Sequence, residues 1–176
     1  MVKRNFRALR VNRASAGRAI GVLRAGPHSI PVALGRGGIR ANKFEGDGAT
    51  PRGLFRLVRL WWRADRALRP STSLPVRQIR ADDGWCEDPA DRNYNRAVKL
   101  PISDGADRLW RADHLYDFII ELDHNTRPRL SRRGSAVFIH VARVGLSPTA
   151  GCVALPAPAL RRLLAQIASY TVIEIG

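Results

Sequence analysis

The sequence of 176 residues has few of the features that indicate a metal site, a disulfide scaffold or a membrane anchor. Its only cysteines, Cys86 and Cys152, are too few and too far apart for a disulfide framework or a CxxC metal site. No apolar run is long enough to span a membrane. The longest apolar run near the N-terminus, Ala19–Leu23, is shorter than the roughly 7–15 residues of a signal peptide. We therefore expect no metal, no other cofactor and no membrane span, and we recognise no signal peptide.

Acidic residues are also scarce. The chain has 15 Asp and Glu against 30 Lys and Arg, which gives a formal net charge of +15. Such an excess attracts polyanions, for example nucleic acid, anionic lipid or an anionic cell-wall polymer. The arginines extend from Arg4 to Arg162 rather than forming one tail, so a generally basic solvated surface is an equal alternative. Because zinc-finger, RRM and P-loop motifs are missing, nucleic acid is not the expected partner.

The length and the 45% hydrophobic content predict one globular domain over residues 1–176. Alternating or β-branched segments predict short strands, and Gly35–Gly38 predicts a turn. Proline at 156 and 158, followed by apolar residues at helical spacing from Leu160 to Ala168, predicts one amphipathic helix. The fold class is therefore mainly β. The predicted strands are Arg7–Asn12, Ala19–Leu23, Ser29–Leu34, Leu54–Trp62, Val76–Ile79, Asp117–Leu122 and Tyr170–Ile175.

Two further segments lack a clear period. Asp82–Arg96 is dense in aromatic and charged residues and is interpreted as an irregular loop, of the kind that carries recognition residues on a rigid scaffold. Its carboxylates could meet a substrate amine, or they could form salt bridges within a surface loop. Ala106–Tyr116 is interpreted as a short helix or a turn.

The segment Val137–Leu155 contains the candidate chemistry, His140 and Cys152. Ser135–Val141 alternates like a strand, which puts His140 on one face, and Gly145–Thr149 then predicts a returning loop. A thiol with its ordinary pKa of roughly 8.5 is mostly protonated at neutral pH, so a cysteine nucleophile needs a base nearby. His140 is the candidate base. A structural cysteine and a structural histidine are the alternative interpretation.

The run from His140 to Thr149-Ala150-Gly151-Cys152-Val153 resembles the active-site signature of the L,D-transpeptidase catalytic domain, the YkuD-like family. Thr50-Pro51-Arg52-Gly53 is similar to the family's Thr-Pro-x-Gly turn, and Gly84–Pro89 with Tyr94-Asn95-Arg96 resembles one branch of it. The resemblance covers most of the chain, from about Gly35 to Ile175. Ala150 and Ala154 depart from the His and the polar residue that many members carry at those positions, and this bears on the substrate contacts.

The resemblance implies a β-sandwich or barrel with one or two short helices. It implies that Cys152 is the nucleophile, that His140 is its base and that a backbone carbonyl, for which Val141 is the candidate, orients the imidazole. Backbone N–H groups of Gly151 and Cys152 would form the oxyanion hole. The substrate would be a peptidoglycan stem peptide, and the location would be the periplasm or cell wall, although without a visible signal peptide the cytoplasm stays open. The expected substrate-binding residues are Thr149, Trp85, Tyr94 and Arg96.

We therefore predict a cysteine-dependent L,D-transpeptidase that transfers an acyl group from a Cys152 thioester to an amine. The nearer alternative is an L,D-carboxypeptidase or amidase on the same scaffold, because the sequence does not say what resolves the thioester. The more distant alternative is a non-catalytic, basic nucleic-acid-binding module.

Overall fold

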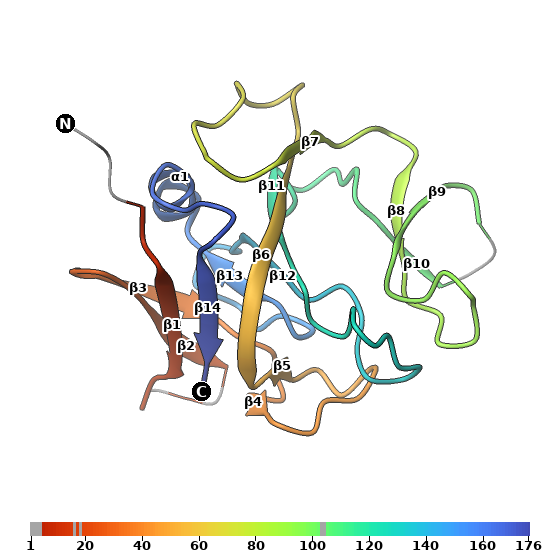
Figure 1. The fold of residues 1–176 in the computed structure, drawn as a ribbon, viewed down its shortest axis with the longest axis horizontal. Helices are drawn as coiled ribbons and strands as arrows, with labels where there is room; N and C mark the ends of the chain where they lie inside the picture. The colour runs from red at the N-terminus through yellow and green to blue at the C-terminus, as the bar shows by residue number, and fades with distance from the viewer. Residues whose placement is uncertain (1–4, 16, 18, 103–104) are drawn as a thin grey trace.

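The computed structural model describes residues 5–15, 17, 19–102 and 105–176. Its main sheet closes on itself, because β11 pairs with β12 on one side and with β6 on the other (Figure 1). Closure satisfies the backbone groups that an open sheet would leave at its edges. β7 (Val76–Gln78) extends the sheet beside β6. In spatial order the ring contains β6 (Gly53–Trp62), β11 (Phe118–Leu122), β12 (Phe138–Val141), β13 (Val153–Leu155), β3 (His28–Ala33), β2 (Ile20–Ala25), β1 (Ala8–Arg13) and β14 (Val172–Ile175).

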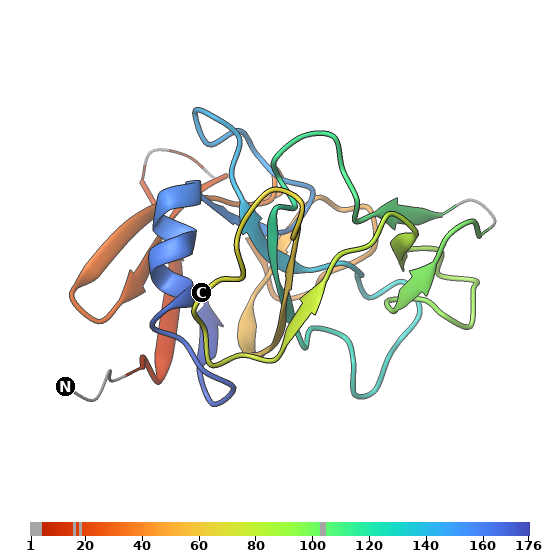
Figure 2. The ribbon, with the colours of Figure 1, turned by 90° about the horizontal axis from the view of Figure 1, so that it is seen from above.

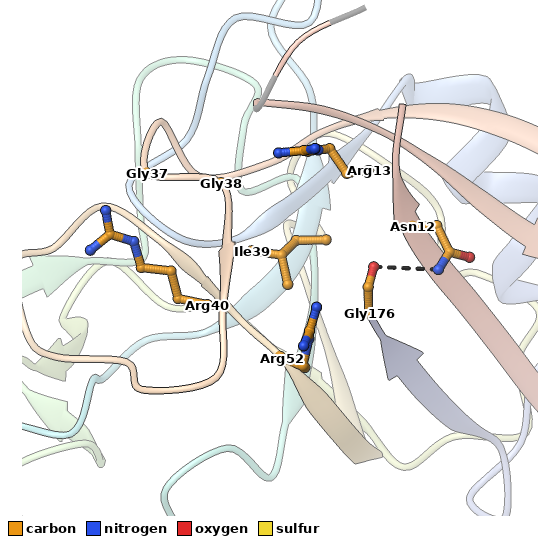
Figure 3. Close-up of a pocket in the computed structure, with 8 residues that line it drawn as sticks. All are labelled: Asn12, Arg13, Gly37, Gly38, Ile39, Arg40, Arg52 and Gly176. Carbon is orange, nitrogen blue, oxygen red and sulfur yellow. Dashed lines mark hydrogen bonds between the residues drawn. The ribbon is translucent and has the colours of Figure 1, made fainter. Parts of the chain in front are cut away.

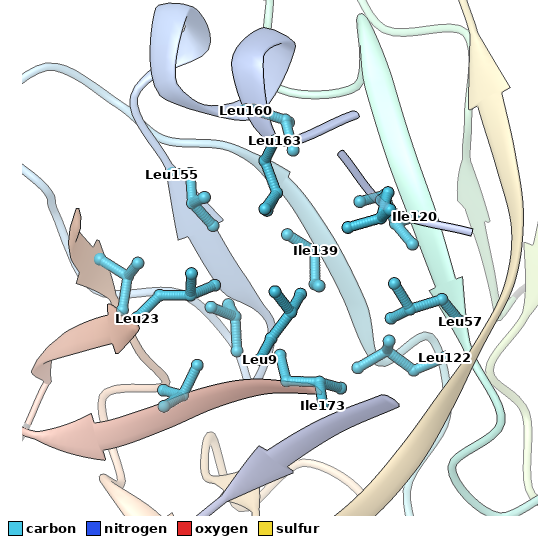
Figure 4. Close-up of a cluster of buried hydrophobic side chains, with 14 of the residues drawn as sticks. Leu9, Leu23, Leu57, Ile120, Leu122, Ile139, Leu155, Leu160, Leu163 and Ile173 are labelled. Carbon is cyan, nitrogen blue, oxygen red and sulfur yellow. The ribbon is translucent and has the colours of Figure 1, made fainter. Parts of the chain in front are cut away.

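The barrel interior is filled by alternate residues of these strands, as the period of two requires. Leu9 and Val11 of β1 are fully buried while their neighbours are exposed, and Ile173 of β14 lies in the same cluster. Ile120 and Ile139 contribute from β11 and β12 (Figure 4). The mainly β prediction and its strands are confirmed, with boundaries shifted by one to three residues.

The predicted helix is α1, Ala157–Leu164, which has Pro156 as its N-cap residue and a second proline in its first turn. Leu160 and Leu163 point from α1 into the barrel core (Figure 4), and Figure 2 shows the helix lying over one end of the barrel. The apolar spacing predicted up to Ala168 continues beyond the helix as a buried turn. No helix among the described residues has the length and apolarity that a membrane crossing requires.

Two smaller sheets complete the fold. β8 (Asp83–Cys86) pairs with β9 (Ala97–Lys99) and β10 (Ala106–Arg108) in an antiparallel sheet at one side of the barrel (Figure 1). β4 (Ile39–Arg40) and β5 (Thr50–Pro51) form a parallel pair. The interpretation of Asp82–Arg96 as wholly irregular was therefore wrong. Ala106–Tyr116 also begins with a strand rather than a helix, because β10 pairs with β8 across a long stretch of chain that the local sequence does not reveal.

The few aromatic residues gather where the small sheet covers the outer face of the barrel. The Trp85 ring lies 5.0 Å from the Phe138 ring and 6.4 Å from the Trp61 ring, both edge to face. Tyr116 continues the row at 6.4 Å from Phe138. Such edge-to-face contacts add to the stabilisation from burial. Both faces of β12 are consequently buried, the inner one by aliphatic and the outer one by aromatic side chains.

Ile139→Ala tests this packing. Ile139 is fully buried at the centre of the barrel, so the substitution is expected to lower the free energy of unfolding by about 2–5 kcal/mol. The exposed Leu68 is the matched control, because Leu68→Ala should change that energy by less than about 0.5 kcal/mol. Urea unfolding monitored by tryptophan fluorescence measures both. Similar costs at the two positions would contradict the assignment of Ile139 to the core.

Candidate active site

The parallel pairing of β12 with β13 brings the two candidate residues to one surface. His140 is the register partner of Ala154, and Cys152 stands two residues before Ala154, so all three lie on the outer face of the barrel. His140 and Cys152 therefore occupy diagonal positions on neighbouring strands. Both are nearly buried, at 6% and 9% exposure. The predicted strand and the loop Gly145–Thr149 that returns the chain are both present.

Backbone groups hold the Cys152 side chain. Its Sγ donates to the Ala136 carbonyl at 3.2 Å and accepts from the Phe138 N–H at 3.4 Å. Burial raises the pKa of the Cys152 thiol to about 12. Ala136 has a φ of +50°, a left-handed conformation that is uncommon for a residue with a Cβ. The thiol is thus protonated at neutral pH and is directed at a backbone acceptor.

The imidazole of His140 is held by the backbone as well. Its Nδ1 lies 2.8 Å from the carbonyl oxygen of Val141, and because a carbonyl only accepts, the proton is on Nδ1. The Nε2 lone pair is left as the basic site. The Tyr116 ring packs edge to face at 5.4 Å, and burial lowers the pKa of His140 to about 4. This is the contact expected for the Val141 carbonyl, whose role in orienting a catalytic imidazole stays a prediction.

The loop before Cys152 is fixed by Thr149 and Gly151. The Gly151 N–H donates to Thr149 Oγ1 at 3.1 Å, and that hydroxyl donates to the Cys152 carbonyl at 2.7 Å. Gly151 has a φ of +149°, and a Cβ there would lie 2.9 Å from the Ala49 carbonyl oxygen. Glycine is required here because the loop packs directly on the Ala49 backbone. Ala49, which directly precedes the Thr50-Pro51-Arg52-Gly53 motif, thus supports the cysteine loop.

Cys152 lies between two cavities. A small cavity of about 180 Å³ contains His140, Thr149 and Arg143 in its lining. A second cavity of about 380 Å³ is lined by three carboxylates and is called the acidic cavity. The residues that line both are Arg111, Tyr116, Ala150 and Cys152. The carboxylates are Glu45, Glu87 and Asp107. A thiol between two cavities can meet one reactant from each side.

The predicted substrate-binding residues do not lie together in the structure. Thr149 lines the small cavity, whereas Trp85, Tyr94 and Arg96 line neither cavity. Trp85 and Tyr94 are buried, and their polar groups donate to Asn95 Oδ1 and to Glu45 respectively. Arg96 is exposed. Direct substrate contact by these three stays a prediction. The Trp85 and Tyr94 contacts suit residues that position the cavity wall.

Several residues at the site were not predicted from the sequence. Arg111 and Tyr116 line both cavities, and Asp107 accepts from the Tyr116 hydroxyl at 2.7 Å. Lys43 is buried beside the site, where it forms an ion pair of 2.6 Å with Asp47. The motif Thr50-Pro51-Arg52-Gly53, which follows Lys43 and Asp47 in the chain, was the nearest sequence signal. Within the described ranges, no His, Cys, Asp and Glu side chains group as metal ligands, and both cysteines are free thiols.

A wider cavity of about 600 Å³ lies away from Cys152, beside β4 and the ends of β1 and β14. Its side chains include Arg13, Arg40 and Arg52 and no carboxylate. Figure 3 shows Arg13 and Arg52 on either side of Ile39, with Arg40 directed to the far side of the strand. None of the three arginines forms an ion pair within the described residues, so this cavity is a strongly basic surface.

The structure is thus a closed, mainly β domain with a cysteine and a histidine on the outer face of adjacent strands. The family model of the L,D-transpeptidase catalytic domain, YkuD, matches residues 11–175, and the chain belongs to this family. The resemblance to the family found in the sequence is thereby confirmed. No curated protein matches the chain in sequence.

Solved L,D-transpeptidases are among the similar structures. One from Mycobacterium smegmatis is 12% identical, with a TM-score of 0.44 over 96% of this chain and 58% of that chain. L,D-transpeptidase 1 from Mycobacterium tuberculosis is 12% identical, with a TM-score of 0.41 over 96% of this chain and 61% of that chain. L,D-transpeptidase 3 from the same organism, in complex with a faropenem-derived adduct, is 13% identical, with a TM-score of 0.41 over 95% and 59%. This chain therefore spans about three fifths of the length of these proteins.

The burial of His140 makes a prediction about stability and pH. The unfolded chain binds a proton at this residue below its ordinary pKa of 6.5, whereas the folded protein does so only near 4. Stability should therefore fall as pH drops from 6.5 to 4, and this residue should contribute a loss of about 3 kcal/mol. His140→Gln should remove that part of the loss. Urea unfolding of both proteins at several pH values between 4 and 7 measures it, and parallel curves would refute the buried neutral imidazole.

Proposed function

We propose that this domain is a cysteine L,D-transpeptidase that acts on peptidoglycan stem peptides. The observation that supports it most directly is the position of Cys152 between two cavities, on the same face as His140. A group-transfer enzyme needs room for both an acyl donor and an acyl acceptor at one nucleophile. Family membership supports the reaction class.

In the first half-reaction the Cys152 thiol attacks the carbonyl carbon of the L,D peptide bond. Its proton passes to Nε2 of His140 as the C–S bond forms. The tetrahedral intermediate then collapses, the C–N bond breaks, and the imidazolium returns the proton to the departing amine. Because the free thiol and imidazole are both neutral, proton transfer accompanies attack instead of preceding it.

The developing oxyanion needs donors close to Cys152. The backbone N–H groups of Gly151 and Cys152 are the proposed pair. The Gly151 N–H donates to Thr149 Oγ1 in the resting protein, so it must turn to or be shared with the oxyanion. The Cys152 N–H is therefore the main proposed donor. The rigid packing of Gly151 on Ala49 supports this role, because a fixed donor needs no reorganisation during the reaction.

In the second half-reaction an amine attacks the thioester and the thiol is released. Water in place of the amine would make the enzyme a carboxypeptidase or amidase. The cavity opposite His140 has enough volume for a side-chain amine and its flanking atoms, and this favours transfer to an amine. The place of the Cys152 thiol between two cavities also argues against the non-catalytic nucleic-acid module, which needs no such thiol.

The cavity with Arg13, Arg40 and Arg52 supports a second partner, an anionic cell-wall polymer. Unpaired guanidinium groups attract repeated phosphates or carboxylates, and the net charge of +15 strengthens the long-range attraction. Both partners fit a protein that works in the periplasm or cell wall, and we propose that location.

The thioester is tested by intact-mass analysis after incubation with a tetrapeptide muropeptide or with a carbapenem, whose strained carbonyl traps an acyl-enzyme. Wild-type protein should gain one acyl group, and Cys152→Ala should gain none. Cys86→Ser is the matched control, because Cys86 is fully buried and lines neither cavity, so acylation should persist. Equal loss of the adduct in a folded Cys86→Ser protein would overturn the assignment of the nucleophile.

The base is tested by the rate of the same reaction. His140→Ala should slow acylation by roughly 10²–10⁴-fold, the usual contribution of a positioned general base. Stopped reactions analysed by mass measure the rate. His28→Ala, at an exposed position in β3 remote from the cavities, should leave it unchanged. An acylation rate in His140→Ala within threefold of wild type would remove His140 from the mechanism.

A further inference from the structure

The acidic cavity differs in charge from the small cavity that shares Cys152. The small cavity has Arg111 and Arg143 in its lining and no carboxylate. The acidic cavity has Glu45, Glu87 and Asp107. Three cationic side chains, Arg36, Lys43 and Arg111, line the acidic cavity too, so its effect on a ligand depends on which of these charges are already paired. What distinguishes the two cavities is that only the acidic cavity offers carboxylates to a reactant beside Cys152.

Two of the three carboxylates already accept hydrogen bonds from hydroxyl groups of the protein. Glu45 accepts from the hydroxyls of Ser135 and Tyr94, and Asp107 accepts from that of Tyr116. Glu87 has no hydrogen-bond donor to its side chain among the described residues. It follows β8 directly, and the backbone bond of 2.7 Å from its N–H to the Gly105 carbonyl fixes its position at the cavity wall.

The cations of the acidic cavity do not neutralise Glu87. Lys43 is paired with Asp47 at 2.6 Å, and Arg111 is paired with Asp113 at 2.8 Å and with Asp107 at 3.7 Å. Arg36 is exposed to solvent, where screening weakens its field. Burial raises the pKa of Glu87 to about 7, and the neighbouring carboxylates of Asp107 and Glu45 add to the rise. A half-buried carboxylate without a cationic partner is best satisfied by an ammonium group from a ligand.

We propose that the acidic cavity receives the acyl acceptor as a primary ammonium ion and that Glu87 binds it and accepts its first proton. This inference rests on the proposed function and names what resolves the thioester. The ammonium gives one proton to the Glu87 carboxylate, and the neutral amine attacks the thioester carbon. The C–S bond then breaks, and the second proton passes from nitrogen to the leaving sulfur by way of His140. Glu87 afterwards loses its proton to solvent.

The test separates recognition of the acceptor from formation of the acyl-enzyme. Acyl-enzyme is first formed with a muropeptide donor and is then resolved by water, by N-α-acetyl-lysine or by hydroxylamine. N-α-acetyl-lysine presents an ammonium group, whereas hydroxylamine is uncharged at neutral pH. In Glu87→Gln the resolution by N-α-acetyl-lysine should slow by about 10- to 100-fold, as one charge-assisted hydrogen bond is lost. Hydrolysis and hydroxylaminolysis should stay within about twofold of wild type.

Two variants serve as controls. Glu87→Asp keeps the charge and should restore part of the lost rate, with a raised KM for the amine. Glu174→Gln removes one carboxylate from the exposed pair with Arg10, remote from the cavity, and should change nothing. Equal slowing for the amine and hydroxylamine, or an unchanged ratio of aminolysis to hydrolysis, would overturn the role of Glu87. Failure of the wild type to form any acyl-enzyme would instead remove the proposed function, and this inference with it.

Discussion

The parallel pairing of β12 with β13 is the constraint on which the candidate site depends. Residues two apart on a strand share a face, so the pairing of His140 with Ala154 fixes Cys152 on the same side of the barrel as the imidazole. A slip of one residue would turn one of the two side chains into the aliphatic core. That core resists the slip, because Ile139 and Val153 are register partners that are both fully buried.

The outer face of β12 would be exposed if the barrel were the whole structure. The small sheet of β8, β9 and β10 covers it, and the aromatic rings between the two sheets exclude water from the site. The same cover has an electrostatic result, since desolvation disfavours the charged form of each group. It raises the pKa of the Cys152 thiol and lowers that of His140, so the resting pair is neutral. In the proposed mechanism, transfer of the thiol proton to His140 must therefore accompany attack on the substrate carbonyl.

The predictable part of this structure is the part with a local signal. Alternation in Ser135–Val141 separates the residues of the inner and outer cores, and proline followed by helical spacing locates α1. The missed parts depend on contacts between distant segments. The Ser135 hydroxyl reaches Glu45 across 90 residues, and β10 is a strand only because β8 lies beside it. No period in a short window carries such information. Arg111 and Tyr116 were not predicted at the site for the same reason, because their place there follows from tertiary packing.

The net charge of the whole chain does not predict which charges a ligand meets at a single site. Charges separated by more than a Debye length of roughly 8 Å are largely screened at physiological salt, so a bound small group experiences mainly the residues that line its own cavity. In the two proposals above, the +15 of the whole chain acts on the approach to a long polyanion, while the groups that line the acidic cavity, with the carboxylate of Glu87 foremost, act on an amine beside Cys152. The two proposed effects are compatible because one acts over a surface and the other within a cavity. On these proposals a basic domain can remain on an anionic polymer and still select a cationic amine.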